Sequence, residues 1–320
     1  MVYYLGINGI AEGARLDVDL RKANELFHDF ESDNYDRKWG ILYDQDNARR
    51  VRRKFEKLLR GPFPHVGKLL EVGCGTGYVG LNLCLGGDHI DELYACDISQ
   101  GMVDVCSKNA SELGIEVHAK RSELENLAYP DDQFDMIVGH AIIHHIPDVR
   151  QALAEIYRVL VPGGICMLAG EPTRNGDKLG RFARAVTARA VDWYAAHGGY
   201  FGGIPARLRE AAPGGDEDTG ARGFEDVVDI HTFDPPEVCE LARSVGFSEV
   251  RYESEELVSS FVGWITRTID NKLAEENLTF RWRYWCYNTY LRLSRLDERI
   301  YRFLPASWFY NMLLYLRKPA

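Results

Sequence analysis

Three glycines separated by single residues give this sequence its clearest sign of chemistry. Gly73, Gly75 and Gly77 lie in the stretch LLEVGCGTGYVG, residues 69–80, directly after a short apolar run. Glycine lets the backbone turn tightly and approach a ligand without obstruction by a Cβ atom. The helix expected after the turn would offer unpaired N–H groups to an anionic group. The stretch therefore predicts a strand, a ligand-binding turn and a helix.

The frame of these glycines argues against a dinucleotide ligand. Gly75, Gly77 and Gly80 satisfy the pattern GxGxxG by themselves. In a dinucleotide fingerprint, however, the first glycine closes the strand, and here that glycine is Gly73. Counted from Gly73, the third glycine would stand at Tyr78, so the pyrophosphate-binding pattern fits poorly.

Two acidic residues are expected beside this turn. Glu71 precedes the glycines on the strand, where its charge would oppose a pyrophosphate but suit a cationic amino group. Asp97 ends the next expected strand, 20 residues after Gly77, and a carboxylate there can accept hydrogen bonds from ribose hydroxyls. The indicated ligand has a ribose, a cationic amine and an anionic group, and S-adenosylmethionine (SAM) carries all three.

At this point the chain resembles the class I SAM-dependent methyltransferases, in the manner of the type 11 and type 25 domains. LLEVGCGTG matches the family's first motif and ACDIS its second. The run SELENLAYPDDQFDMIVGHAIIHHIPD resembles the third-strand loop, the fourth strand and the segment after it, and YRVLVPGGICML resembles the approach to the fifth strand. The resemblance is close over about residues 45–170 and looser over 235–254 and 307–319. It implies SAM as cofactor and S-adenosylhomocysteine as product.

The resemblance also implies how the first two motifs would hold the cofactor. Glu71, Gly73 and Gly75 would surround the methionine end of SAM, with Gly77 supporting the turn. Asp97 would hold the ribose, although an aspartate at this position could instead be the N-cap of the following helix.

Further residues would contact the adenine. Ile98 and Met102 would pack on the ring, although both could equally be core residues. Glu123 would lie near the adenine amino group, with Ser122 and Leu124 beside it. The family more often has Asp where this chain has Glu123, and Ser122 and Glu123 could instead be solvated loop residues.

Two more positions complete the implied cofactor site. His140 ends the fourth expected strand, where a backbone carbonyl usually meets the ligand. Tyr35 belongs to an N-terminal segment of the kind that often folds over SAM in this family.

Methyl transfer from a sulfonium mainly requires alignment and desolvation, because the methyl group is already activated. An alcohol acceptor also needs a base to take its proton. The candidates are His140, His144, His145 and Glu171, which follow the fourth and fifth expected strands. Relatives with different substrates share the HHIPD segment, so His144 and His145 could serve only to cap and pack. We interpret His231 as a loop or helix-entry residue.

Strand and helix patterns alternate from residue 67 to residue 170 and resume after residue 235, which predicts an α/β fold. We expect a Rossmann-like, doubly wound, seven-stranded, mostly parallel sheet with an antiparallel last strand, a helical N-terminal cap and two helical insertions. Six segments follow: a helical cap (1–60), the SAM-binding core (61–170), an insertion that could be a substrate lid (171–234), a core continuation (235–254), an aromatic and basic helical insertion (255–306) and a final core strand (307–320).

Substrate choice should reside in the cap and the insertions, because the sheet itself is committed to SAM. Residues 281–320 carry eight Lys and Arg against two acidic residues, beside an apolar stripe through Leu293, Leu296, Ile300 and Phe303. Such a helix can lie at a membrane interface or cover a lipid-like substrate. The alternative is that the stripe docks on the sheet and the arginines pair with the acidic remainder. Peripheral membrane contact through residues 281–303 therefore remains an open expectation.

Composition limits the other possibilities. A net charge of −10 argues against nucleic-acid partners, which need clustered cations. Seven cysteines without a CxxC pair are expected to be reduced thiols, and no clustered ligands indicate a metal site. No signal peptide or membrane-spanning run is expected, so the predicted location is cytoplasmic, with or without peripheral membrane contact.

The leading hypothesis is a SAM-dependent methyltransferase acting on oxygen or carbon of a small, hydrophobic acceptor such as a lipid, quinone or polyketide. One alternative is a non-catalytic SAM-binding subunit with a regulatory or structural role. Another is a protein or RNA methyltransferase, although GHAI after the fourth strand lacks the loop used for amino-group targets. A nicotinamide dehydrogenase is the remaining rival. The acceptor and the oligomeric state stay open.

Overall fold

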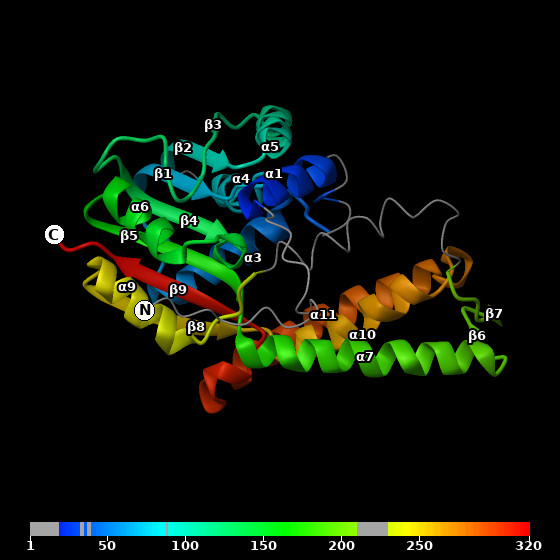
Figure 1. Cartoon of the computed structure of the whole chain (residues 1–320). Helices are drawn as coiled ribbons and strands as arrows, with labels where there is room; N and C mark the ends of the chain where they lie inside the picture. Colours follow the sequence, from blue (N-terminus) through cyan, green and yellow to red (C-terminus); the bar gives the residue numbers. More distant parts are fainter. Residues whose placement is uncertain (1–18, 33–34, 37–39, 88, 210–229) are drawn as a thin grey trace. The chain divides into compact units, whose positions relative to one another are not determined.

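The computed structural model describes residues 19–32, 35–36, 40–87, 89–209 and 230–320, and Figure 1 shows its elements. The contacts divide the chain into two compact units. One consists of Met1–Glu171, Gly220–Glu253 and Leu313–Ala320, and the other of Pro172–Thr219 and Ser254–Met312. Each unit therefore combines segments that are far apart in the sequence.

Among the described residues, a seven-stranded sheet forms the centre of the first unit and confirms the predicted α/β class. The strand order is β3-β2-β1-β4-β5-β9-β8, and β1 to β5 run parallel to one another. Strand β9 is antiparallel to β5, since the Gly163 N–H donates to the Pro319 carbonyl while that of Thr173 donates to Tyr310. The strands are β1 (Val66–Val72), β2 (Ile90–Asp97), β3 (His118–Arg121), β4 (Phe134–His140), β5 (Leu160–Pro172), β8 (Glu249–Glu255) and β9 (Asn311–Arg317).

Local signals explain where the helices of this unit begin and end. Ser99 caps α5 through its hydroxyl, which accepts from the Met102 N–H, and Gly114 ends the same helix in the left-handed conformation (φ 68°). The sequence predicts a basic amphipathic helix over about Asn47–Arg60, but α3 begins at Gln45, because Asp44 caps it through a carboxylate that accepts from the Asn47 N–H. The helices are α1 (Leu20–Glu31), α3 (Gln45–Leu59), α4 (Tyr78–Leu85), α5 (Gln100–Leu113), the short η2 (Ile143–His145), α6 (Val149–Val159) and α9 (Pro235–Val245).

Two strands differ from the sequence prediction. The run IEVHA, residues 115–119, predicts the third strand, but this strand occupies His118–Arg121, because only these residues pair with β2. The fifth strand begins at Leu160, so VPGG lies inside it rather than before it. Gly163 adopts φ 79° there, which a residue with a Cβ atom rarely adopts.

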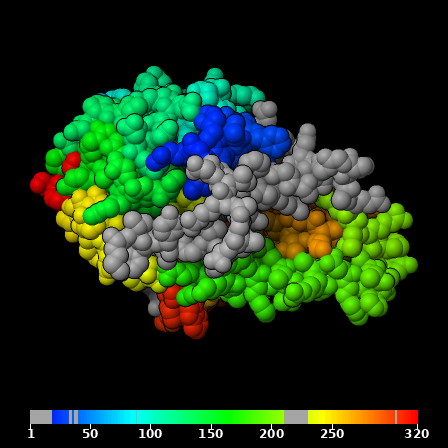
Figure 2. Space-filling model, in the orientation of Figure 1, coloured from blue at the N-terminus to red at the C-terminus, as the bar shows by residue number. Residues whose placement is uncertain are grey.

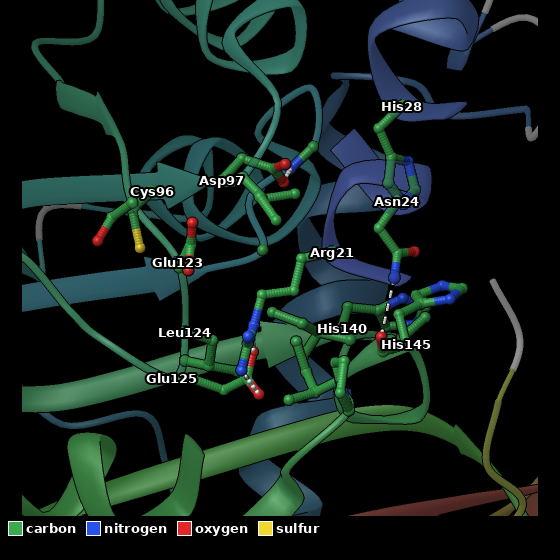
Figure 3. Close-up of a pocket in the computed structure, with 18 of the residues that line it drawn as sticks. Arg21, Asn24, His28, Cys96, Asp97, Glu123, Leu124, Glu125, His140 and His145 are labelled. Atoms are coloured by element: carbon green, nitrogen blue, oxygen red, sulfur yellow. Dashed lines mark hydrogen bonds and ion pairs between the residues drawn. The ribbon is translucent and has the colours of Figure 1, made fainter. Parts of the chain in front are cut away.

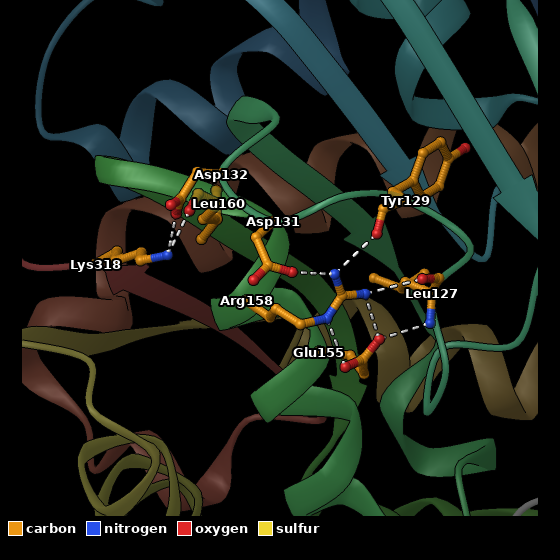
Figure 4. A network of polar contacts seen from close by, with 8 residues as sticks. All are labelled: Leu127, Tyr129, Asp131, Asp132, Glu155, Arg158, Leu160 and Lys318. Carbon is orange, nitrogen blue, oxygen red and sulfur yellow. Dashed lines mark hydrogen bonds and ion pairs between the residues drawn. The ribbon is translucent and has the colours of Figure 1, made fainter.

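A half-buried arginine holds the connection between β3 and β4 against α6. Arg158 pairs with Glu155 of its own helix and with Asp131, at 2.7 Å each. Lys318, after β9, reaches the same connection through Asp132. Figure 4 shows the complete network, which also includes the carbonyls of Leu127, Tyr129 and Leu160.

Three long helices dominate the second unit, and they come from both predicted insertions. Helix α10 packs against α7 and against α11. These two neighbours of α10 lie about 100 residues apart in the sequence. A two-stranded hairpin accompanies them. The elements are α7 (Arg174–Ala196), β6 (Tyr200–Phe201), β7 (Ile204–Pro205), α10 (Val258–Lys272), η3 (Glu275–Asn277), α11 (Phe280–Ile300), η4 (Tyr301–Phe303) and η5 (Ala306–Trp308).

Helix α10 receives its N-terminal cap from another helix. Leu257 occupies the N-cap position and has no side chain that can accept a hydrogen bond. The buried carboxylate of Asp297, on α11, instead accepts from the N–H groups of Leu257, Val258 and Ser259 at 2.9–3.1 Å. This contact fixes the pairing of the two helices, because a buried helix end needs partners for its free N–H groups.

We predict that Asp297→Ala lowers the free energy of unfolding of this unit by about 2–3 kcal/mol, because three N–H donors at the start of α10, one of them fully buried, lose their acceptor. Tryptophan fluorescence during urea unfolding suits the measurement, since five of the six tryptophans belong to this unit. The matched control is Glu298→Ala, which removes the exposed neighbouring carboxylate. Equal midpoints for the two variants would contradict the role of Asp297.

Candidate functional site

A pocket lies beyond the carboxyl ends of β1, β2 and β4, where the strand order reverses on either side of β1 (Figure 3). The register explains this convergence. Val72 pairs with Cys96 on one side and with Gly139 on the other, so Gly73, Asp97 and His140 follow at one level. Ligands of open α/β sheets bind at such switch points. The pocket holds about 740 Å³ of space, including the part open to solvent.

Most residues predicted to bind a cofactor line this pocket, and some do not. The lining contains these predicted residues: Tyr35, Gly73, Gly75, Asp97, Ile98, Ser122, Glu123, Leu124, His140 and His145. Five other predicted residues are described by the structure but do not line the pocket: Glu71, Gly77, Met102, His144 and Glu171. The structure thus separates the candidates into groups that face the pocket and groups that lie behind it.

The glycines of the turn are required by its geometry. Gly73 and Gly75 adopt φ values of 56° and 49°. A Cβ atom on Gly73 would lie 2.2 Å from Cδ1 of Ile142, which leaves no room for another residue. A Cβ atom on Gly77, with φ 96°, would lie 2.6 Å from Cδ1 of Leu81, so this glycine lets α4 pack closely behind the turn.

Glu71 lies beneath the turn and caps α4. Its two carboxylate oxygens accept from the N–H groups of Val79 and Gly80, at 2.9 and 2.8 Å. Burial raises the pKa of Glu71 to about 8, although the two N–H donors oppose this shift. A Cβ atom on Gly80 would lie 2.7 Å from the carboxylate, which explains the glycine there. A direct contact of Glu71 with a cofactor stays a prediction.

Asp97 ties the ends of β1 and β2 together. One oxygen accepts from the Gly75 N–H at 2.9 Å and the other from the Ser99 N–H at 3.0 Å. The N-cap of α5 is Ser99, so the alternative role of Asp97 as N-cap is wrong. An ionised carboxylate offers about four acceptor sites, so Asp97 can still accept hydrogen bonds from a ligand that enters the pocket.

The connection after β3 forms another side of the pocket. Ser122 is fixed there, since its N–H donates to the Asp97 carbonyl at 2.9 Å and its hydroxyl accepts from the Ala128 N–H. Leu124 is almost fully buried and supplies apolar surface to the lining. Met102 is wholly buried in the core instead, which is the alternative that the sequence left open for it.

Helix α1 contributes lining residues that the sequence analysis missed. Arg21 forms two hydrogen bonds with Glu125, at 2.8 and 2.9 Å, and the buried Asn24 donates to the His145 carbonyl at 2.9 Å (Figure 3). Asp29 accepts from the Gly101 N–H at the start of α5. These contacts bind α1 to the segments after β2, β3 and β4. The available signal was weak, since only Asp19, the N-cap of this helix, marks its start.

His140 faces the pocket as a neutral imidazole. Burial lowers its pKa well below the usual value, and the cations Lys54 and Arg50 lower it further. The Lys54 ammonium lies 3.4 Å from Nε2 of His140. Burial also lowers the pKa of His28, whose ring lies 5.6 Å from that of His145 on the same pocket. Imidazoles with a lowered pKa are uncharged at neutral pH and keep a free lone pair, although they are weaker bases than an ordinary histidine.

Glu171 holds the segment after β4 in place. It is fully buried, and its carboxylate accepts from the N–H groups of Ile142, Ile143 and His144. The same carboxylate lies 2.8 Å from Nδ1 of His144, whose ring packs 3.9 Å from that of His145. Glu171 and His144 thus support the pocket wall from behind, while His145 belongs to the wall.

His231 belongs to the same surroundings but not to the lining. Its backbone N–H donates to the His144 carbonyl at 3.1 Å, and burial lowers the pKa of its imidazole. Within the part of the chain that the structure describes, no group of three His, Cys, Asp or Glu side chains could hold a metal ion.

Comparison with known proteins agrees with this geometry. Residues 70–168 match a family model described as a methyltransferase domain. The uncharacterized methyltransferase YcgJ of Bacillus subtilis is 35% identical over 102 residues, 32% of this chain and 39% of YcgJ. A demethylmenaquinone methyltransferase of Anoxybacillus flavithermus is 29% identical over 148 residues, 45% of this chain and 61% of that protein. The matches thus span about two fifths to three fifths of these relatives.

A solved structure extends the similarity of fold over most of the chain. The crystal structure of the cyclase SpnF superposes with a TM-score of 0.55 at 17% identity, covering 94% of this chain and 96% of SpnF. At this level of identity the likeness concerns the fold alone.

The lowered pKa of His140 predicts a loss of stability in acid. Its folded-state pKa lies below the unfolded value near 6.5, so its contribution is present above pH 6.5 and is lost as the pH falls. The free energy of unfolding falls as the pH is lowered from 7.5 to 5. This fall should be about 1–2 kcal/mol smaller for His140→Gln than for the wild type. Urea titrations at several pH values measure this. His118→Gln, at the exposed edge of the sheet, is the control, and identical slopes for wild type and His140→Gln would contradict the prediction.

Proposed function

We propose, from the premise that residues 70–168 form a class I methyltransferase domain, that this chain binds SAM in the pocket of Figure 3 and methylates a small-molecule acceptor. The observation that carries the proposal is the register of β1, β2 and β4. It places the glycine turn, the Asp97 carboxylate and a neutral imidazole on one pocket. SAM supplies a methyl group on a sulfonium, and S-adenosylhomocysteine is left after transfer.

The residues present fit such a cofactor. The backbone at Gly73 and Gly75 is free of Cβ atoms and would approach the methionine end. Asp97 would accept from the ribose hydroxyls with its remaining lone pairs. Apolar surface at Ile98 and Leu124 suits the adenine ring, and Ser122 holds that side of the pocket in place.

Proton transfer is the step in which the chain's side chains would act directly. During methylation of a hydroxyl, the oxygen forms a bond to the methyl carbon, the sulfur–carbon bond breaks, and the hydroxyl proton must go to a base. His140 and His145 are the sequence candidates that line the pocket. We assign the role of proton acceptor to one of these two imidazoles. His144 and Glu171 are positioning residues, because they contact the wall and not the pocket.

We further propose that the acceptor is hydrophobic and is methylated on oxygen or carbon. Apolar and aromatic residues of the pocket support an apolar acceptor, and the name of the demethylmenaquinone methyltransferase relative makes quinols the first class to examine. A chain that binds SAM without turnover on any acceptor would instead fit a non-catalytic SAM-binding subunit.

Asp97→Ala should weaken SAM binding by about a hundredfold, because two charge-assisted hydrogen bonds to the ribose are lost. Isothermal titration of SAM and S-adenosylhomocysteine into wild type and variant measures this, with NAD as the negative control. The matched variant is Asp104→Ala, which removes an exposed carboxylate of α5. Wild-type protein that is folded but binds no SAM would overturn the proposal, and so would stronger binding of NAD than of SAM.

Replacing the pocket imidazoles should separate chemistry from binding. We compare His140→Ala with His145→Ala. One of the two variants should lower kcat for a hydroxyl acceptor by about 100-fold, and its Kd for SAM should change less than threefold. The readout is formation of S-adenosylhomocysteine with a panel of quinols and catechols. The wild-type rate should rise with pH until the base is deprotonated, and this dependence should vanish in the affected variant. Unchanged kcat in both variants would exclude these residues as bases.

A further inference from the structure

Exposed apolar side chains are concentrated in the second unit. Of the eighteen large apolar side chains that are exposed among the described residues, fifteen belong to Pro172–Thr219 and Ser254–Met312. The three in the first unit are Leu26, Phe30 and Leu42. Single exposed apolar residues are ordinary, but a concentration of this kind marks a surface that contacts something other than water.

The three helices of this unit bury almost none of their large side chains. The buried residues of α7, within the described part of the chain, are Gly176, Gly180 and Ala183, and those of α10 and α11 are Ser259 and Asp297. Their larger side chains are half-buried or exposed, and those that join the helices, such as Val191, Ile269 and Trp282, are only partly buried. The packing of the unit leaves its apolar surface outside.

One exposed row runs along α7. Leu179, Phe182, Val186 and Trp193 follow at spacings that place them on one helix face, and each is 39–63% exposed. We call this row the α7 stripe. Helical periodicity places Lys178 and Arg189 next to this stripe, and both residues are also exposed. Figure 2 shows the solvent side of α7, in green.

Helix α11 combines exposed aromatic residues with arginines. Its first two turns expose Phe280, Tyr284, Trp285 and Tyr287. The following turns expose Arg292, Arg295 and Arg299, which recur at helical spacing on one face. We call these three residues the arginine row. Leu296 and Phe303 of the predicted apolar stripe are exposed as well, so that stripe is not a buried face.

The charge of these helices is opposite to that of the whole chain. Together α7, α10 and α11 carry twelve Lys and Arg against five Asp and Glu, whereas the chain has a net charge of −10. Four of the five acids are engaged within the unit, as Asp177 with Arg181, Asp192 with Lys272, Asp270 with Trp282, and Asp297 with the end of α10. The arginine row has no acidic partner among the described residues, so its positive charge is available at the surface.

We propose that the α7 stripe and the arginine row dock this unit on the surface of an anionic lipid bilayer. Trp, Tyr and Phe insert favourably at the boundary between headgroups and acyl chains, and arginines attract anionic headgroups. The described helices contain no segment long and apolar enough to cross a membrane, so contact is confined to the surface. A second copy of the same surface fits less well, because the two arginine rows would repel each other.

Sedimentation with vesicles tests this proposal on the full chain. The probes are vesicles of phosphatidylcholine alone and vesicles in which about a quarter of the lipid is phosphatidylglycerol. We expect binding to the anionic vesicles, at least about tenfold weaker binding to the neutral ones, and a steep loss with added salt. Replacing Arg292, Arg295 and Arg299 by Gln should lower the partition coefficient at least about tenfold, and so should Phe182→Ser with Trp193→Ser.

The matched control removes three exposed cations of the first unit, as Arg53→Gln, Lys108→Gln and Arg317→Gln. It should bind anionic vesicles as the wild type does, and circular dichroism checks that every variant is folded. Equal loss in this control and in the arginine-row variant would overturn the proposal, because only net charge would then matter. Absence of vesicle binding would also overturn it. So would a wild-type dimer that Phe182→Ser with Trp193→Ser dissociates, because a second copy would then cover the surface.

Vesicle binding is measured without SAM, so its result is independent of the proposed enzymatic function. A chain that binds SAM but no vesicles would retain the pocket proposal and lose this one. A chain that binds anionic vesicles but no SAM would do the reverse.

Discussion

Two buried carboxylates hold the turn between β1 and α4, and the geometry of the pocket depends on them. Glu71 accepts the first N–H groups of α4 from below, and Asp97 accepts the Gly75 N–H from the neighbouring strand. A turn with positive φ at alternate residues has few backbone bonds of its own. Without these acceptors its N–H groups would point into a poorly solvated space. The carboxylates satisfy them and leave the inner surface of the turn open to a ligand.

The same principle recurs at two other places. Glu171 gathers three N–H groups of the segment after β4, and Asp297 gathers three at the start of α10. In each case a carboxylate distant in sequence replaces a local cap. Their burial is therefore explained by backbone hydrogen bonding, and a buried acidic residue in this protein is not by itself a sign of catalysis. For Glu171 this separates positioning from chemistry, because His145 and His140 face the pocket while Glu171 does not.

The two units differ in how much of their apolar surface is buried. The sheet unit has a dense core of aliphatic side chains around β1, β4 and α4. The helical unit has only a small buried cluster, around Ala206, Leu273 and Leu278, and it exposes aromatic side chains beside arginines. The proposed contact with a lipid surface would account for these exposed side chains, and it would suit the proposed methylation of a hydrophobic acceptor.

The succession of strands and helices along the chain, the glycine turn and the position of Asp97 could be predicted from the sequence, because they depend on short-range patterns of apolar residues and glycine. The third strand was displaced in the prediction because its bounds depend on pairing with β2. The contacts of α1, the inward position of Glu71 and the burial of Asp297 rather than Leu296 needed the tertiary structure. Periodicity shows that a helix has an apolar face, but which face is buried depends on partners far away in the sequence.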